Sequence, residues 1–375
     1  MSSQRRSPSR KLQLEDLLLV TTYRCNSRCV MCHIWMDDPD WKQEIKPADL
    51  EANLPPSLRD INISGGEPFL RTDIPEFYAV CREKCPRAHI VISTNGLLTE
   101  RILEQTKRMF QVDKRVGYGI SLDGLDEMHD QVRGIPGGFR KGLDTVRALK
   151  GMGVTNIRIA FTVTSGNYQH LGKVYDLARK EGVQFTAAVA HDSDHYFKIR
   201  GNLLPMVEQV APQFDRIVHD EMKTMNPRRW FRGYFFDGLK EYVGTRQRRL
   251  PCQAGWLSTM IDPYGNVFAC NIMDWKMGNI REKTLEEILL SQRAGEVRDD
   301  VSKCSACWMV CTARTALRKY PFKVGGWVVR HKLMAHLAPS PQVPADAPAP
   351  GAAKGNGAGE RLVGIAPAPE VAAKR

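Results

Sequence analysis

Three cysteines near the start of the chain are the first residues whose spacing could do chemistry. Cys25, Cys29 and Cys32 have the pattern C-x3-C-x2-C and follow a short apolar run. Three thiolates on one loop can bind three irons of a [4Fe–4S] cube and leave the fourth iron without a protein ligand. An open metal position is where a second molecule can coordinate. The alternatives are an incomplete zinc site and three unrelated thiols.

A second group of cysteines lies in the last third of the chain. Its members are Cys252, Cys270, Cys304, Cys307 and Cys311. The segment 261–268 predicts a β-hairpin, with two apolar arms around a Pro-Tyr-Gly-Asn turn, and such a hairpin brings its flanking cysteines together. Four of these thiols suffice for one iron–sulfur cube, but paired thiols are also typical of structural zinc sites.

The two remaining cysteines are not candidate ligands. Cys81 and Cys85 are four residues apart in a helical pattern, so they share one helix face and are expected to be buried packing residues. A polar group after the last predicted strand of the first half is a candidate for substrate contacts or for solvated loop positions. It consists of His191, Asp192, Asp194 and His195.

The elements that must position these residues follow from the hydrophobic pattern. Strands are predicted over 16–21, 60–63, 89–93, 116–122, 156–162 and 184–189. Helices are predicted over 46–53, 74–84, 99–110, 139–152, 169–181 and 284–296. Alternating strands and helices predict right-handed βαβ units and a parallel sheet. Six strands are too few for an eight-stranded barrel, so we expect an α/β fold with an open or partial (βα)6 barrel.

Polar motifs follow several of these strands, where active sites of parallel sheets lie. The segments are Ser64-Gly65-Gly66-Glu67-Pro68, Ser93-Thr94-Asn95-Gly96 and Ser121-Leu122-Asp123-Gly124. Paired glycines let the backbone approach a ligand closely, and a carboxylate can bind an ammonium group. Asn-Gly and Asp-Gly are also ordinary turn dipeptides, so turn capping is the alternative role.

Taken together, the first cysteine loop and these motifs resemble the signature of the radical S-adenosylmethionine (radical SAM) enzymes over roughly residues 15–200. The resemblance implies that the open iron binds S-adenosylmethionine (SAM), whose cleavage by an electron gives a 5′-deoxyadenosyl radical. It also implies a set of cofactor contacts. These are Gly65, Gly66, Glu67, Asn95, Ser121, Asp123 and Arg133. For Arg133, a solvated surface position is the alternative.

The second cysteine group resembles the start of the SPASM extension, because Cys252, Gly265 and Cys270 give C-x12-G-x4-C. In the resembled family this extension binds auxiliary [4Fe–4S] clusters. A full SPASM domain has seven motif cysteines, and only five occur here, so we expect a twitch-like domain with one cluster for electron transfer. The firmest expected ligands are Cys252, Cys270 and Cys307. Cys304 and Cys311 compete for the fourth place, and we favour Cys304 because C-x2-C makes a compact pair.

The predicted domain organisation follows from these motifs and from composition. It is a disordered basic arm over 1–12, a radical SAM core over 13–225, a linker with a small α+β SPASM/twitch-like domain over 226–320, a basic amphipathic helix over 321–337, and a disordered Ala/Pro/Gly tail over 338–375. The helix is expected either to pack on the domain or to contact an anionic membrane surface.

The charge of the chain concerns its partners. It has 54 basic and 42 acidic residues, a net charge of +12. This charge fits an anionic substrate or an acidic electron donor such as flavodoxin or ferredoxin. A nucleic-acid partner is not expected, because no basic module with interleaved aromatics is present. The sequence shows no apolar run long enough for a transmembrane helix or a secretory signal, so a cytoplasmic location is expected.

The resemblance therefore predicts a cytoplasmic radical SAM enzyme that abstracts hydrogen from a small-molecule, sugar-like or lipid-linked metabolite. A peptide-modifying maturase is the alternative. Only about two dozen residues precede Cys25, and we expect these to be too few for an N-terminal peptide-recognition domain. A non-catalytic iron–sulfur electron carrier is a remoter alternative, because it would not explain the Gly-Gly-Glu motif.

Overall fold

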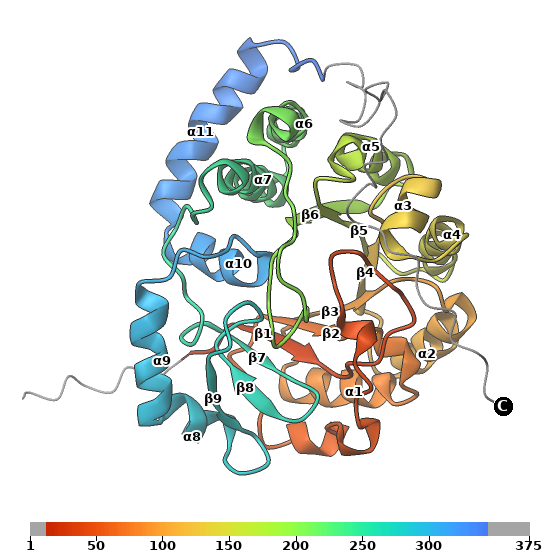
Figure 1. Ribbon diagram of the computed structural model, residues 1–375, viewed down its shortest axis with the longest axis vertical. Helices are drawn as coiled ribbons and strands as arrows, with labels where there is room; N and C mark the ends of the chain where they lie inside the picture. Colours follow the sequence, from red (N-terminus) through yellow and green to blue (C-terminus); the bar gives the residue numbers. More distant parts are fainter. Residues whose placement is uncertain (1–12, 344–375) are drawn as a thin grey trace, which may run out of the picture. The chain divides into compact units, whose positions relative to one another are not determined.

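Six parallel strands form the first part of the structure, a computed structural model that describes residues 13–343. They are β1 (Asp16–Val20), β2 (Asp60–Ser64), β3 (His89–Thr94), β4 (Gly117–Ser121), β5 (Asn156–Val163) and β6 (Gln184–Val189). They pair in sequence order, and the sheet curves as a partial barrel (Figure 1). All six strands were predicted to within one residue at each end, because buried parallel strands are nearly continuous apolar runs. The α/β partial-barrel prediction is confirmed.

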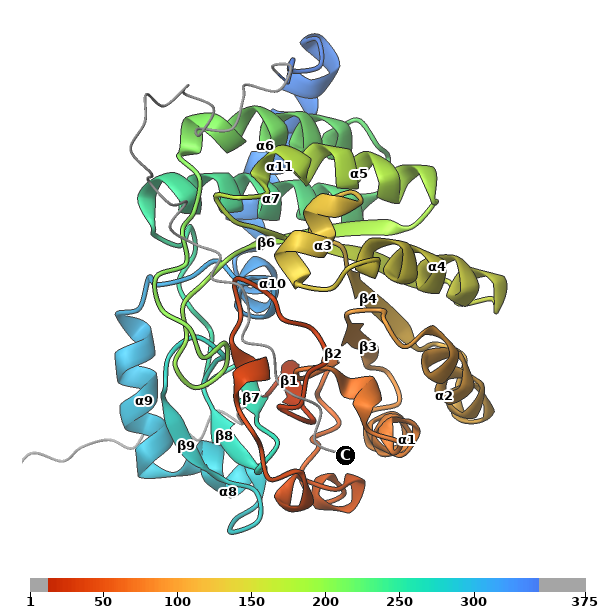
Figure 2. The same cartoon turned by 45° about the vertical axis from the view of Figure 1, so that its right-hand side comes forward.

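Helices in the crossovers cover the outer side of this sheet (Figure 2). They are α1 (Ile74–Lys84), α2 (Thr99–Val112), α3 (Glu127–Arg133), α4 (Gly138–Gly151) and α5 (Leu171–Lys180). Strand β5 illustrates why helices pack on this side of the sheet. Its residues alternate in burial, and Ile157, Ile159 and Phe161 are buried. The intervening residues Arg158 and Thr162 face cavities on the inner side of the sheet.

Two helix predictions were wrong in part. The segment 46–53 is not an α-helix but contains the short 3-10 helix η3 (Pro47–Leu50). The helix ends after one turn, because the chain then bends toward Pro55 and Pro56, which cannot continue a helix. The helix predicted over 284–296 is two helices, α8 (Leu285–Leu290) and α9 (Gln292–Ser302). The break falls at Ser291, whose backbone is extended and whose Oγ accepts a hydrogen bond from Ala294 N, so it caps the second helix.

The remaining 3-10 helices are short connectors. They are η1 (Ile34–Met36), η2 (Trp41–Gln43), η4 (Pro68–Leu70) and η5 (Tyr168–His170). The first two belong to the loop that carries the chain from the first cysteine group to β2.

The C-terminal strands extend the same sheet. They are β7 (Ser258–Ile261), β8 (Asn266–Phe268) and β9 (Lys276–Asn279). Strand β7 pairs in parallel with β1, and the full order is β6-β5-β4-β3-β2-β1-β7-β8-β9. Strands β7 and β8 form the predicted hairpin, with Met260 opposite Phe268. The second cysteine group is therefore built on the edge of the sheet that carries the first.

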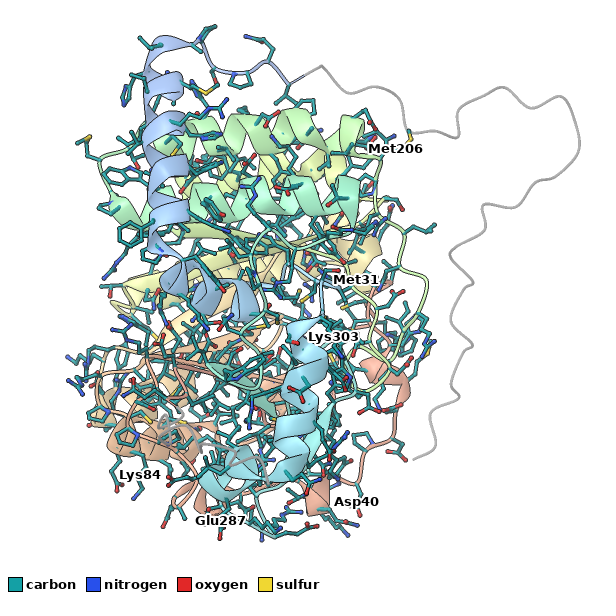
Figure 3. The ribbon with its side chains drawn as sticks, turned by 90° about the vertical axis from the view of Figure 1, so that its left-hand side faces the viewer. Met31, Asp40, Lys84, Met206, Glu287 and Lys303 are labelled. Atoms are coloured by element: carbon teal, nitrogen blue, oxygen red, sulfur yellow. The ribbon has the colours of Figure 1, made fainter. Side chains whose placement is uncertain are left out.

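Four further helices complete the described part of the chain. They are α6 (Val207–Met222), α7 (Pro227–Thr245), α10 (Val310–Lys319) and α11 (Pro321–Leu337). The helices α6 and α7 pack against each other, and α11 runs along their outer side (Figure 3). No helix within residues 13–343 is both long and apolar enough to cross a membrane. The predicted arm over 1–12 and the tail from 344 onward lie outside the described residues.

Candidate functional site

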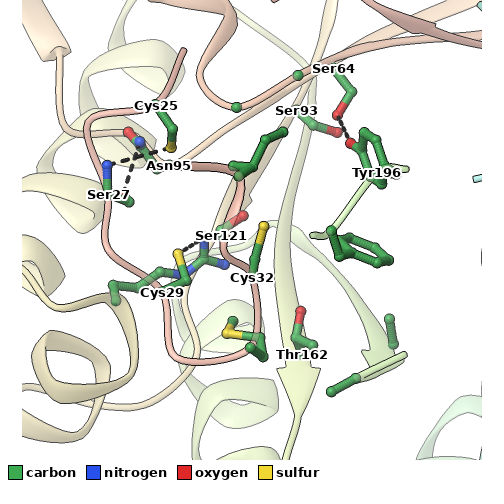
Figure 4. A pocket seen from close by; sticks show the side chains of 18 of the residues that line it. Cys25, Ser27, Cys29, Cys32, Ser64, Ser93, Asn95, Ser121, Thr162 and Tyr196 are labelled. Atoms are coloured by element: carbon green, nitrogen blue, oxygen red, sulfur yellow. Dashed lines mark hydrogen bonds between the residues drawn. The ribbon is translucent and has the colours of Figure 1, made fainter. Parts of the chain in front are cut away.

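A pocket at the C-terminal ends of the parallel strands brings the first cysteine group together with the strand-end motifs (Figure 4). It is lined by Cys25, Cys29, Cys32, Gly65, Gly66, Asn95, Ser121 and Arg133, which are eight of the ten residues predicted for this site. Thr162, at the end of β5, also lines it. Parallel strands end at one edge of a sheet, so motifs distant in sequence converge there.

The glycine pair fits closely against the beginning of the cysteine loop. Gly66 N donates to Thr22 O at 2.9 Å, and Glu67 N donates to Arg24 O at 2.8 Å. A Cβ atom at Gly66 would lie 2.3 Å from Arg24 O, and one at Gly65 would lie 2.5 Å from Thr22 O. These distances are far shorter than a van der Waals contact. The glycines are therefore required for the approach of two backbone segments.

Glu67, one of the predicted cofactor contacts, is not among the residues that line the pocket. The side chain is fully buried and accepts hydrogen bonds from Phe69 N, Thr94 Oγ1 and Asn95 N. Burial raises the pKa of Glu67 to about 7, and these hydrogen bonds oppose the increase. The carboxylate positions the loop after β3, and the pocket-lining part of the motif is its glycines.

Asp123 likewise lies behind the pocket, while Arg133 enters it. The carboxylate of Asp123 accepts hydrogen bonds from Thr162 N and from Arg133 Nε. Arg133 Nη1 lies 3.6 Å from Cys29 Sγ. Burial opposes the charged form of Arg133, but Asp123 and Cys29 together hold its pKa above the usual value. Of the two roles considered for this arginine, the surface position is excluded.

Asn95 orders the cysteine loop. Its Nδ2 donates to Asn26 Oδ1 at 2.7 Å and to Ser27 Oγ at 3.0 Å. Burial raises the pKa of all three thiols, and Arg133 opposes this for Cys29 and Cys32. A buried group of thiols next to a guanidinium suits ligands that bind as thiolates.

The second cysteine group converges around Cys307. Burial raises the pKa of Cys252, Cys270, Cys304 and Cys311, and in each case the Cys307 thiol raises it further. Cys304 also raises the pKa of Cys252, whereas Cys270 raises that of Cys311. The Cys252 thiol also raises the pKa of Cys270, so the charges of these thiols influence one another across the whole group.

The donor atoms of the two cysteine groups can be compared with what a metal centre requires. Within residues 13–343, no three His, Cys, Asp or Glu side chains are close enough together to hold a single metal ion. A cube of four irons holds its thiolates farther apart than one tetrahedral zinc ion does. The donor sets, three thiols in one group and five in the other, fit iron–sulfur clusters.

Comparison with known families settles what these two groups belong to. Residues 19–178 match the model of the radical SAM superfamily, and residues 252–308 match the SPASM model, an iron–sulfur cluster-binding domain. The chain belongs to the radical SAM superfamily and carries a C-terminal SPASM domain. Its cofactors are SAM and a [4Fe–4S] cluster in the first domain, with auxiliary cluster binding in the second.

Several curated relatives of this radical SAM protein have names that state a function. Fe-coproporphyrin III synthase of Methanosarcina barkeri is 34% identical over 43% of this chain and 40% of its own length. The subtilosin biosynthesis protein AlbA of Bacillus subtilis is 26% identical over 72% and 58%, and the mycofactocin maturase MftC of Mycolicibacterium smegmatis is 28% identical over 66% and 62%. The chain therefore spans between 40% and 62% of these relatives' lengths.

Solved structures share the fold. SuiB of Streptococcus suis matches with a TM-score of 0.57 at 14% identity, over 76% of this chain and 68% of its own. The enzyme anSMEcpe with bound AdoMet matches with a TM-score of 0.51 at 17% identity, over 84% and 99%. At 14% and 17% sequence identity, these similarities show only that the fold is shared.

The radical SAM pocket also contains aromatic residues that the sequence did not reveal. Tyr196 and Phe197 line it from the loop after β6, and Trp35 lines it from η1. The aliphatic Met309 lines it from the loop before α10. The hydroxyl of Tyr196 lies 3.2 Å from Ser64 Oγ, next to the glycine pair. The one feature of the sequence that could have indicated them is the pair of adjacent aromatic residues, Tyr196 and Phe197, directly after the polar group 191–195.

Only His191 of that polar group faces the pocket. Asp192 accepts hydrogen bonds from the backbone of Gly201 and Asn202, and Asp194 pairs with Arg200 at the surface. His195 lies at 3.2 Å from Cys270 O and stacks on Phe268. In this loop, therefore, His191 lines the pocket, whereas the other three residues make contacts within the fold.

The close fit of Gly66 gives a direct test of the pocket. Gly66→Ala should greatly reduce both the iron bound after anaerobic reconstitution and the cleavage of SAM, because the new Cβ displaces the cysteine loop. The control is Gly151→Ala, where a Cβ meets no atom within 4 Å. Iron content and 5′-deoxyadenosine formation measure the effect. Wild-type values in Gly66→Ala would contradict the fit.

Proposed function

We propose that this enzyme reductively cleaves SAM in the pocket of Cys25, Cys29 and Cys32 and abstracts hydrogen from a small-molecule, sugar-like or lipid-linked metabolite. When bound there, the cluster and SAM would supply the 5′-deoxyadenosyl radical for that step. The observation that carries the proposal is the convergence of the three thiols with the strand-end motifs in one pocket. The chain's own groups then bind, orient and shield the reactants.

Each group in the pocket has a role in the proposal. The thiols would hold three irons, and Arg133, fixed by Asp123, would neutralise charge beside Cys29 and pair with the carboxylate of SAM. The backbone at Gly65 and Gly66 would accept the amino group. Asn95 and Ser121 would contact the polar parts of the cofactor.

His191 is proposed to contact the substrate. Its Nδ1 lies 2.6 Å from Val189 O, and a carbonyl only accepts, so Nδ1 carries the proton. The other nitrogen, Nε2, is buried and has no hydrogen-bond partner within residues 13–343. Burial lowers the pKa of His191 to about 4, so the ring is neutral at pH 7. Its Nε2 can therefore accept a hydrogen bond from a substrate hydroxyl or amine, or take up a proton.

A peptide-modifying reaction is the second candidate. It is favoured by the names of the relatives AlbA, a bacteriocin biosynthesis protein, and MftC, a maturase, and by the fold shared with SuiB. The synthase of an iron porphyrin among the relatives favours a small molecule instead.

The cleavage step can be tested without knowing the substrate. Reconstituted anaerobically with iron and sulfide, and reduced with dithionite, the enzyme should convert SAM to 5′-deoxyadenosine. Cys29→Ala should abolish this, because the cluster loses one of its three thiolates. Cys81→Ala is the matched control, since Cys81 lies on helix α1 and is buried in the core. Absence of 5′-deoxyadenosine from the wild type would refute the proposal.

For the SPASM domain we propose one auxiliary cluster held by Cys252, Cys270, Cys304 and Cys307, with electron transfer as its role. The loop that carries Cys307 is fixed by Trp308, which is fully buried and donates from Nε1 to Phe235 O at 3.0 Å. A Cβ at Gly238 would lie 2.4 Å from that Nε1, so the indole packs directly on α7. This support holds the ligand loop near the pocket, which Met309 lines.

Iron content distinguishes the ligands. Cys270→Ala, Cys307→Ala and Cys304→Ala should each remove one cluster's worth of iron and leave SAM cleavage intact, because the first cluster is separate. Cys311→Ala should retain the wild-type iron content. The reverse result for Cys304 and Cys311 would show that the fourth ligand has been misassigned.

The partners proposed are an acidic electron donor such as flavodoxin or ferredoxin in the cytoplasm, and an anionic membrane surface. Helix α11 supports the second. Its inner side packs on α6 and α7 through Val324 and Ala335, but large apolar side chains remain on its outer side. Phe322, Val329, Leu333 and Leu337 are between 62% and 93% exposed. Residues 321–343 contain no acidic side chain.

Membrane contact predicts a specific effect of charge on α11. The protein should co-sediment with vesicles that contain phosphatidylglycerol and less with vesicles of phosphatidylcholine alone. Leu333→Glu should weaken this binding, because it places a carboxylate in the apolar face, whereas Leu290→Glu on α8, also at an exposed leucine, should not. Equal binding of both variants and the wild type would argue against this surface.

A further inference from the structure

A second cavity lies at the opposite end of the parallel strands from the cofactor pocket. It has a volume of about 640 Å³ and lies between strand β6, helix α7 and helix α10. Six arginines line it: Arg59, Arg158, Arg228, Arg232, Arg314 and Arg318. Asp60 is the only carboxylate among the described residues that line it. The walls are thus strongly cationic.

Most of these arginines are paired within the fold. Arg314 and Arg318 pair with Asp60, and they reach Asp16 and Glu15 respectively. Arg232 pairs with Glu221 and donates to Phe185 O at 3.2 Å. These contacts hold α7 and α10 against the ends of the strands. They leave few acidic groups for the other arginines.

Arg158 differs from these paired arginines because it has no acidic partner in the part of the chain that the structure describes. Among residues 13–343, no carboxylate pairs with its guanidinium within 4.0 Å, and the guanidinium donates a hydrogen bond from Nη2 to Asn156 Oδ1 at 3.4 Å. Its Nε is buried and has no hydrogen-bond partner in that part of the chain. Burial lowers the pKa of Arg158 to about 10, and Arg314 and Arg232 lower it further while Asp60 opposes them. The group is still charged at pH 7.

A largely buried guanidinium that shares a cavity with other arginines is unfavourable unless an anion compensates it. We propose that this arginine-lined cavity binds a small polyanion, whose phosphate or paired carboxylate groups lie against Arg158. A guanidinium presents donors in a planar fork that suits both kinds of group. Phe185, Phe231 and Phe235 line the same cavity, so the ligand carries an apolar part as well.

This site is separate from the radical SAM pocket. Arg158 and Thr162 lie on the same face of β5, and four residues of strand span about 13 Å. Thr162 lines the cofactor pocket, whereas Arg158 lines the cationic cavity. Met309 and Val310, adjacent in sequence, line one cavity each. A ligand at Arg158 therefore does not compete with SAM.

The test uses the reconstituted full-length enzyme and two probes, inorganic phosphate and tricarballylate, with chloride at equal ionic strength as the reference. Thermal unfolding should shift upward with at least one probe beyond the chloride value. Phosphate alone would indicate a phosphate ligand, and tricarballylate alone a carboxylate ligand. Arg158→Met should unfold at a higher temperature than the wild type without anion, because it removes an uncompensated buried charge, and should bind the probe about tenfold more weakly.

Arg147→Met is the matched control, since Arg147 is half-exposed on α4 and pairs with Glu181 away from the cavity. It should keep the wild-type response. Arg228→Met, at the exposed rim, provides a second variant if Arg158→Met does not fold, and it should also weaken binding. No response of the wild type to either probe, or an unchanged response in the cavity variants, would overturn the proposal. SAM cleavage is not part of the readout, so failure of the proposed function would be a separate result.

Discussion

The radical SAM site depends on one close contact between two backbone segments. The amides of Gly66 and Glu67 donate to the carbonyls of Thr22 and Arg24, which join the end of β2 to the beginning of the cysteine loop after β1. No side chain fits in this contact. The glycines therefore place the three thiols and the cofactor-binding edge of the sheet in a fixed relation, and the Glu67 carboxylate extends that relation to the loop after β3.

The second cysteine group is tied to the same framework. Strand β7 pairs with β1, so the hairpin that carries Cys270 continues the sheet that carries the first group. Tyr196 packs against Cys25 and Cys32 of the first group. Burial raises its pKa, and the thiols of Cys32, Cys311 and Cys25 raise it further. The stacked rings of His191 and Tyr242 make a second link, because the Tyr242 hydroxyl donates to Ala306 O beside Cys307. A shared sheet and two aromatic contacts thus keep the two groups at a fixed separation.

The inner side of the partial barrel has a cavity at each end of its strands. At the C-terminal ends of the strands, small and polar side chains leave room for a cofactor, and charges there are matched, as in the pair of Asp123 and Arg133. At the N-terminal ends, arginines outnumber carboxylates, and Arg158 has no acidic partner within the described residues. The two ends therefore differ in charge balance. Charges are paired in the radical SAM pocket, whereas the arginine-lined cavity has an excess of positive charge that a bound anion would compensate.

The strands of the barrel, both cysteine groups and most of the pocket lining could be predicted from the sequence, because they depend on local patterns: apolar runs, thiol spacing and glycines at strand ends. It did not separate Glu67 and Asp123 from the pocket-lining residues, since a carboxylate that accepts protein hydrogen bonds has the same local sequence as one that faces a ligand. The sequence left open the positions of Tyr196, His191 and Met309 in the pocket, the pairing of β7 with β1, and the lack of an acidic partner for Arg158 within the described residues. Each of these depends on contacts between segments far apart in the chain, and their distances and burial are set only when the sheet closes and α10 packs against it.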